Sequence, residues 1–284
     1  MGAVSTSTLI TVAPTGAETD KADAPALPVS LDELVATAKA CEAMGAGLIH
    51  IHIRDDQARP TLELARLTDT VAAVREATNL VVQLSTGGAV TDPYDARLRV
   101  LEALPDSCSL TCGSVNFGSD VFLNPWDFMV ELYRRTQELE VVPEFELFDV
   151  GHVAALLRLL DKEGLPYGGH VHCDLVLGVP GGAPGTADAV VTMARMLPPG
   201  ATWSATGVGR STLPVALAAL SAGGHLRVGM EDTLTFAPGR PVRDNAELVE
   251  RAATLATTAL RPPMSTDEAR TLLNVKDRRN GDGG

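Results

Sequence analysis

The chain has 284 residues, of which 45% are hydrophobic and 4% aromatic, and its formal net charge is −13. This length suffices for one large domain or two small ones, with Ala, Val, Leu and Gly doing most of the packing. The negative charge argues against nucleic acid as a partner, because phosphate contacts need clustered Lys and Arg. No signal peptide is evident, and no apolar run approaches the ~20 residues of a membrane span. The four cysteines have no zinc-ribbon spacing, so we expect reduced thiols in a cytoplasmic protein without membrane contact.

Strand and helix patterns alternate along the whole chain. The predicted strands are 8–13, 47–53, 80–85, 107–111, 142–147, 169–174, 201–205 and 225–230. The predicted helices are 31–44, 64–78, 94–103, 125–139, 150–163, 187–196, 213–222 and 246–259. Eight such repeats favour a (β/α)₈ TIM barrel in a single domain, residues 1–275, followed by a polar tail, residues 276–284. A doubly wound open sheet is the alternative.

The segment His50-Ile51-His52 carries the strongest chemical signal. Side chains alternate along a β-strand, so both imidazoles point to one side of the strand predicted over 47–53. Such a pair is half of a metal site that still needs carboxylates. Two histidines can also hydrogen-bond without a metal, so the pair alone leaves both interpretations open.

Carboxylates follow two other predicted strands. Glu231 and Asp232 come after 225–230, and Glu18 comes after 8–13. In a barrel the carboxyl ends of all strands meet at one face, so these groups can share a site. Two imidazoles with carboxylates suit zinc first, although non-heme iron uses similar ligands.

Several other residues could take part in the chemistry. Asp232, paired with Arg227, could act as a general base, or it could simply cap a turn or helix. His170 and His172 repeat the alternate spacing and compete as ligands, but no equally clear carboxylate accompanies them. Ser85-Thr86-Gly87-Gly88 offers hydroxyls and open backbone N–H groups for a carboxylate or phosphate, or forms a plain turn.

Two glycine-containing segments offer further ligand-binding hypotheses. The segment 178–185 is rich in glycine and proline and could close over a substrate. The segment 207–212 precedes a predicted helix and could hold an anion at its N-terminus. Each could equally be a plain turn.

Taken together, these motifs resemble the β-keto acid cleavage enzyme family, whose founding activity is 3-keto-5-aminohexanoate cleavage. The matching segments run in order from residue 10 to residue 232: 10–18, 50–55, 85–88, 113–118, 143–146, 178–182 and 227–232.

The resemblance implies a barrel with a catalytic zinc and acetyl-CoA as co-substrate. It implies that a β-keto acid and acetyl-CoA become acetoacetate and a new acyl-CoA through an enolate and a retro-Claisen step. By motif match, the zinc ligands are His50, His52 and Glu231, with Glu18 as a fourth contact. Asp232, supported by Arg227, abstracts the α-proton.

The resemblance also implies residues that bind the substrate. Ser85, with Gly87 and Gly88 beside it, and a hydroxyl after the fourth strand are expected at the substrate carboxylate. Thr111 is the favoured hydroxyl and Ser109 the alternative. Glu144 matches an acidic position of the substrate pocket.

Two other functions compete with this one. A metal-dependent hydrolase or aldolase on the same barrel would not need acetyl-CoA, and a small-molecule sensor would keep the acid and base groups without using them. We further expect a homo-oligomer, because apolar outer helices favour association.

Overall fold

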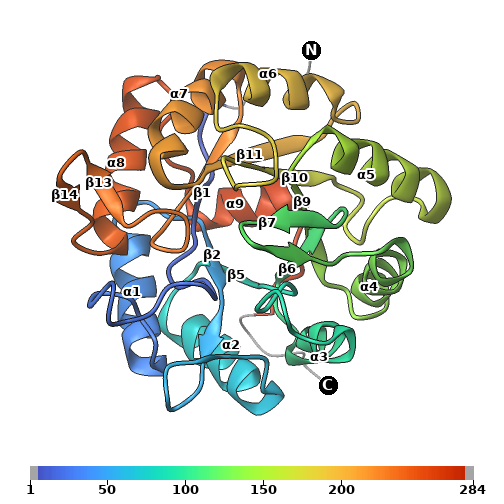
Figure 1. The fold of residues 1–284 in the computed structure, drawn as a ribbon, viewed down its shortest axis with the longest axis horizontal. Helices are drawn as coiled ribbons and strands as arrows, with labels where there is room; N and C mark the ends of the chain where they lie inside the picture. The colour runs from blue at the N-terminus through green and yellow to red at the C-terminus, as the bar shows by residue number, and fades with distance from the viewer. Residues whose placement is uncertain (1–5, 279–284) are drawn as a thin grey trace.

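Eight parallel strands close into a barrel in the computed structural model, which describes residues 6–278. The strands are β1 (Ile10–Val12), β2 (Leu48–Ile51), β5 (Val81–Leu84), β6 (Ser107–Thr111), β9 (Val142–Leu147), β10 (His172–Leu177), β11 (Thr202–Gly207) and β12 (His225–Val228). They follow chain order around the barrel, and β12 pairs with β1. The predicted (β/α)₈ TIM barrel is therefore confirmed, and Figure 1 looks down it.

Helices form the outer ring; the first seven connect successive strands, and the eighth follows the last barrel strand (Figure 1). They are α1 (Leu31–Ala43), α2 (Leu64–Ala77), α3 (Tyr94–Arg99), α4 (Trp126–Glu138), α5 (Val150–Glu163), α6 (Ala187–Met196), α7 (Thr212–Ala222) and α8 (Asn245–Thr258). Each parallel pair needs such a crossover, because the chain must return to the same end of the barrel. The predicted helix over 94–103 is split into α3 and a 3₁₀ turn at Val100–Ala103.

The period of two in the strands separates an apolar outside from a polar inside. In β10, Cys173, Leu175 and Leu177 belong to the core between strands and helices. Their neighbours His172 and Asp174 are also buried but lie on the opposite side of the strand. Side chains of opposite parity face opposite sides of a sheet, so these polar groups fill the barrel interior.

A further helix, α9 (Thr266–Leu273), covers the amino-terminal end of the barrel. Ala269 and Leu273 of this helix pack in one apolar cluster with Leu9, which directly precedes β1, and with Leu48 and Val81, which begin β2 and β5. The sequence analysis did not identify this helix. It closes the end of the barrel opposite to the carboxyl ends of the strands.

Three short hairpins leave the carboxyl ends of barrel strands, and the strand pattern did not predict them. They are β3 (Ile53–Arg54) with β4 (Pro60–Thr61), β7 (Val115–Phe117) with β8 (Asp120–Phe122), and β13 (Thr235–Ala237) with β14 (Arg240–Pro241). The β7–β8 hairpin lies over the centre of the barrel in Figure 1.

The remaining expectations concern the cysteines, the tail and membrane spans. Cys41, Cys108, Cys112 and Cys173 are all buried and free. Of the predicted tail, Lys276 pairs with Glu140 at 2.7 Å and Arg278 donates to backbone carbonyls, while residues 279–284 lie outside the described residues. Within the described part of the chain, no helix has the length and apolarity to cross a membrane.

Candidate metal centre and active site

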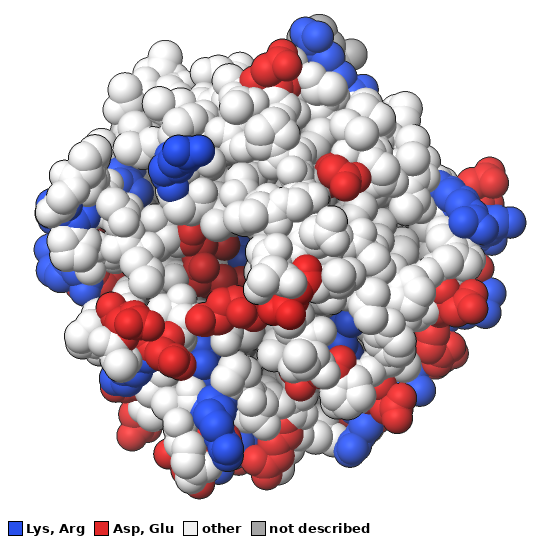
Figure 2. Space-filling model, in the orientation of Figure 1, with Lys and Arg blue, Asp and Glu red and all other residues white. Residues whose placement is uncertain are grey.

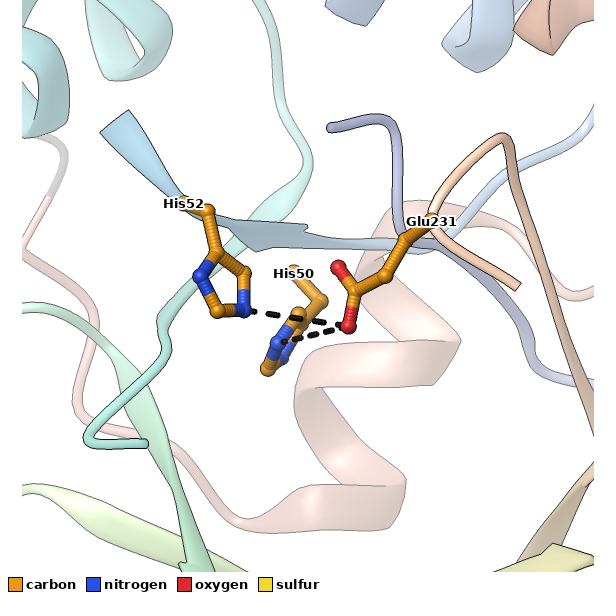
Figure 3. A group of neighbouring side chains, drawn as sticks. All are labelled: His50, His52 and Glu231. Carbon is orange, nitrogen blue, oxygen red and sulfur yellow. Dashed lines mark ion pairs between the residues drawn. The ribbon is translucent and has the colours of Figure 1, made fainter. Parts of the chain in front are cut away.

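The two histidines reach the carboxyl end of the barrel through β2. Ile49 and Ile51 pack toward the helices, which turns His50 into the barrel, and His52 follows directly after the strand. The ring centroids of His50 and His52 lie 5.3 Å apart. Both rings point toward Glu231 (Figure 3), and their Nε2 atoms lie 3.8 Å and 3.7 Å from Glu231 Oε1.

Glu231 and Asp232 stand in a turn after β12. The strand ends at Val228, two residues earlier than predicted. The turn begins at Gly229, where a Cβ would lie 1.8 Å from the backbone oxygen of Ala13. Because the strand has ended, the two adjacent carboxylates need not point to opposite sides, and both line the same cavity.

The donor atoms of His50, His52 and Glu231 suit a divalent cation. One ligand atom from each residue lies within 4.8 Å of the others. Glu231 Oε2 is buried without a hydrogen-bond partner. Nδ1 of His50 contacts Gln83 Oε1 at 2.5 Å, which leaves Nε2 available. A buried carboxylate oxygen beside two free imidazole nitrogens is a donor set that zinc and related metals accept. Glu18 lies at the exposed rim of the same cavity and is not part of this convergent group.

Arg227 organises the carboxylates around the candidate metal ligands. It donates to Asp232 Oδ1 at 3.1 Å and Oδ2 at 3.3 Å, to Glu146 Oε1 at 3.2 Å, and to Glu231. Its side chain is 4% exposed. Asp174, also inside the barrel, lies 3.9 Å from the same guanidinium. One buried cation thus holds several buried carboxylates in a fixed geometry.

The carboxylates differ in acidity for physical reasons. Burial, together with the charges of Glu231 and Glu146, raises the pKa of Asp232 to about 7 against the opposing effect of Arg227. Burial also disfavours the charge of Glu231, but Arg227, His52 and His50 outweigh it and lower its pKa to about 2. Burial, followed by the charge of Arg227, lowers the pKa of His50 to about 4. A neutral imidazole and an ionised Glu231 are the forms that bind metal.

These groups face a cavity of about 230 Å³ at the carboxyl ends of the strands. Its lining includes His50, His52, Arg227, Glu231 and Asp232. Figure 2 shows acidic side chains gathered around the hollow at the middle of this face. The arrangement combines a candidate metal site, a carboxylate with a pKa near neutrality and a fixed cation, which are the parts needed to remove a proton beside a carbonyl group.

Comparison with known proteins identifies the group to which this barrel belongs. The model of the beta-keto acid cleavage enzyme family matches residues 7–275. The chain belongs to the β-keto acid cleavage enzyme family. It is 37% identical over 270 residues to the 3-keto-5-aminohexanoate cleavage enzyme of Fusobacterium nucleatum, covering 94% of this chain and 98% of that one.

Two further similarities place the family in context. The 3-oxoadipate:acetyl-CoA acetyltransferase of Cupriavidus necator is 32% identical over 271 residues, covering 94% of each chain. Among solved structures, apo ObcA superposes with a TM-score of 0.78 at 20% identity, covering 88% of this chain and 66% of that one. The latter similarity supports the barrel fold.

The substrate residues expected from the family are not all at the cavity. Ser85, Gly87 and Gly88 line it. The hydroxyl of Thr111 instead donates to Glu146 Oε2 at 2.7 Å. Ser109, its alternative, accepts the backbone N–H of Thr86 at 3.2 Å. Both are buried in β6, and neither is among the described residues that line the cavity.

Glu144 and Glu146 both point into the barrel but lie at different depths. Glu146 lines the cavity, whereas Glu144 is not among the described lining residues and contacts Gln83 and His172. Glu144 was the residue expected in the substrate pocket from the family resemblance, and no role was expected for Glu146. Since residues two apart in a strand face the same side, the alternation alone could not decide which one reaches the cavity.

A chain of polar contacts runs from His50 toward the other end of the barrel. Gln83 donates from Nε2 to Glu144 Oε1 at 3.3 Å and to Ser107 at 3.1 Å. Glu144 Oε2 lies 3.2 Å from His172 Nε2, and His172 Nδ1 lies 2.7 Å from the Thr202 hydroxyl. Gln83 had no role in the sequence analysis.

His170 and His172 do not form a second metal site. The strand predicted over 169–174 is wrong by three residues, because β10 spans His172–Leu177. His172 therefore begins the strand and His170 precedes it, both far from its carboxyl end. Among the described residues, the convergent His/Cys/Asp/Glu group contains neither of them.

Proposed function

We propose that this enzyme converts a β-keto acid and acetyl-CoA into acetoacetate and a new acyl-CoA, with zinc held by His50, His52 and Glu231. The convergence of those three donors beside the Arg227–Asp232 pair is the observation that carries the proposal. Membership of the β-keto acid cleavage enzyme family supports the reaction class. The name of the Cupriavidus necator relative supports acetyl-CoA as the second substrate.

The reaction balances without a further reactant. Loss of a proton from C2 of the β-keto acid gives a carbanion, which forms a bond to the carbonyl carbon of acetyl-CoA and releases the CoA thiolate. The thiolate then attacks the original keto carbonyl, and the bond between that carbon and C2 breaks. Acetoacetate takes back the proton, and the rest of the keto acid leaves as its CoA thioester.

Asp232 is the group proposed to remove and return that proton. A base works best when its pKa lies near the working pH, and burial raises the pKa of Asp232 to about 7. Arg227 orients the Asp232 carboxylate through contacts to both oxygens. A divalent cation bound at the neighbouring ligands would polarise a carbonyl oxygen and stabilise negative charge there.

The segment after β5 is proposed to hold the substrate carboxylate. Ser85 supplies a hydroxyl at the cavity, and Gly87 and Gly88 leave the backbone open beside it. Gly88 has φ +60, and a Cβ there would lie 2.3 Å from Asp92 Oδ2. We propose that Thr111 contributes indirectly, by holding Glu146.

The test is acetoacetate formation from acetyl-CoA and a panel of β-keto acids by zinc-loaded enzyme. Asp232→Asn removes the base but keeps the shape, and we expect kcat to fall by about 10²- to 10⁴-fold. Zinc affinity should stay within a few-fold of wild type. Asp188→Asn, an exposed change on α6, is the matched control and should leave both quantities unchanged.

A second variant separates metal loss from base loss. His50→Ala should lose both zinc binding and turnover, because it removes a ligand. Stoichiometric zinc with no acetyl-CoA-dependent acetoacetate from any acid would contradict the proposal. That outcome would favour a metal-dependent hydrolase or aldolase on the same barrel.

A further inference from the structure

The active-site cavity is divided into two chemically different halves. The strands β12, β1, β2 and β5 are neighbours in the barrel, and their carboxyl ends supply the proposed metal ligands, Asp232 and Ser85. We call this side of the cavity the metal half. The opposite arc, β6, β9, β10 and β11 with their loops, supplies one carboxylate, Glu146 of β9, and six apolar side chains: Phe117, Phe122, Phe148, Val176, Val179 and Val208. We call these six residues the apolar wall.

The apolar wall is a packed structure. Phe122, Phe148, Val176 and Val179 are each 5% to 7% exposed and form a cluster separate from the main core. Phe117 meets Phe122 and Phe148 edge to face, with ring centroids 6.3 Å and 6.2 Å apart. Such contacts fix the rings, so the wall exists before any ligand arrives.

Two loops hold the wall in place from above. Gly118 of the β7–β8 hairpin donates its N–H to the carbonyl of Pro180, at 3.0 Å. A Cβ at Gly181 would lie 2.1 Å from the backbone oxygen of Asn116, so only glycine permits this approach. In Figure 1 the hairpin lies over the barrel centre, and the loop after β10 lies over β11.

No free charged side chain beside the apolar wall could pair with a charged group of a ligand. Arg227 is the only Lys or Arg among the described residues that line the cavity, and Glu146, Glu231 and Asp232 already bind it. Glu146 itself is held by Arg227 and Thr111. Glu18 belongs to the metal half, after β1. A charged group against the wall would lose water and gain no counter-charge, which is costly.

We propose that the β-keto acid cleaved by this enzyme carries an uncharged aliphatic substituent on its keto carbon, seated against the apolar wall. This inference rests on the proposed function, which places the carboxylate and the reacting carbons in the metal half. The substituent must then extend into the other half.

The test compares four acids as substrates: 3-oxohexanoate, 3-oxooctanoate, 3-keto-5-aminohexanoate and 3-oxoadipate. We expect kcat/KM for the aliphatic acids to exceed that for the two charged acids by about 100-fold or more. The KM of aliphatic acids should fall about fourfold for each added methylene that the wall accommodates.

Paired variants on one hairpin show whether the wall is responsible. Phe117→Ala removes an aromatic side chain of the wall and should raise the KM for 3-oxooctanoate about tenfold or more, with the KM for acetyl-CoA unchanged. Val121→Ala alters an exposed residue of the same hairpin that does not line the cavity, and should change neither value.

The outcomes separate this inference from the reaction itself. Acetoacetate formed mainly from the amino or dicarboxylic acid would overturn the substrate class and leave the reaction standing. The substrate class would also be overturned if Phe117→Ala changed the KM for acetyl-CoA and left the KM for 3-oxooctanoate unchanged. If no acid yields acetoacetate, the proposed function fails, and calorimetric binding of the same acids decides this inference: equal affinity for charged and aliphatic acids overturns it.

Discussion

A neutral His50 can bind a metal through Nε2 only if its proton is on Nδ1. Gln83 and Glu144, which lie deeper in the barrel, favour that tautomer. The hydrogen bond and charge of His172 and the charge of Arg227 outweigh burial and keep the pKa of Glu144 below its usual value. The ionised Glu144 accepts from the Gln83 amide, so Gln83 must turn its oxygen toward His50. Nδ1 then donates to that oxygen, and Nε2 keeps its lone pair for a metal.

Removing this support should weaken metal binding without removing a ligand. We expect Gln83→Leu to lower the zinc affinity by about 10- to 100-fold, because His50 loses the partner that fixes its tautomer and ring orientation. Titration against a chromophoric chelator measures this directly. Ser107→Ala removes another neighbour of Gln83 but leaves the contact to His50, and should cost little. Equal losses in both variants would refute a tautomer-fixing role.

For single residues, the sequence indicated which types take part in the site, but not how far each side chain lies from the carboxyl end of the barrel. The pattern His50-Ile51-His52 is visible in the sequence because it continues the alternation of a strand, and the pair Glu231-Asp232 is visible because it follows a strand. Gln83 is not, because one glutamine in an apolar strand carries no local signal. The contact between Gln83 and His50 depends on the register between β2 and β5, and no local sequence pattern contains that register.

Individual elements differ in how well their ends could be predicted. The helices α5 and α6 match the predicted ranges, because a cap and an amphipathic repeat mark both ends. The strand β10 was placed three residues too early, because His170-Val171-His172 imitates the alternation that continues through the true strand. The hairpins were missed because strands of two or three residues are too short to show a period.

The helix α9 provides a prediction at the scale of elements. Leu273 is 2% exposed and packs against the beginnings of the barrel strands. We expect Leu273→Ala to lower the free energy of unfolding by about 2–5 kcal/mol, because it opens a cavity in that cluster. Denaturant melts measure this loss.

The same variant should leave the active site untouched, since α9 covers the opposite end of the barrel. Zinc affinity and kcat of the folded enzyme should match wild type. Leu272→Ala, which changes a partly buried neighbour on the same helix, should cost less stability. A large change in kcat from Leu273→Ala would contradict the separation of the two ends.

For the whole molecule, the polar interior of the barrel makes stability depend on pH. His225 is 2% exposed and accepts the backbone N–H of Leu9 at Nδ1, 3.1 Å away. Burial, with the nearby charges of His172, Arg261 and His170, lowers the pKa of His225 to about 3. In the unfolded chain its pKa returns to about 6.5.

Between those two values the unfolded chain binds a proton that the folded protein does not. The contribution of His225 to stability is therefore complete above its unfolded pKa and is lost as the pH falls toward the folded value. His225→Asn keeps an acceptor for Leu9 but cannot titrate. From about pH 6 to about pH 4.5 the variant should lose about 2 kcal/mol less unfolding free energy than wild type. Parallel slopes in denaturant melts across that window would contradict this assignment.

The overall architecture was the most predictable feature, because repeated strand and helix patterns leave few arrangements for a chain of this length. The inward polar groups were predictable as a set, since they share one parity in their strands. Which of them lie beside His50, His52 and Glu231 and which lie deeper depends on the stagger between strands. That stagger is set by packing around the closed barrel, so it became visible only in the structure.

The most direct test of the account follows the carbon atoms of acetyl-CoA. Acetyl-CoA labelled with ¹³C in both acetyl carbons is incubated with zinc-loaded enzyme and an unlabelled β-keto acid, and the acetoacetate is examined by NMR. The account predicts label at C3 and C4 only, with the rest of the keto acid recovered as its CoA thioester. Cleavage of the keto acid without transfer of label into acetoacetate would contradict it.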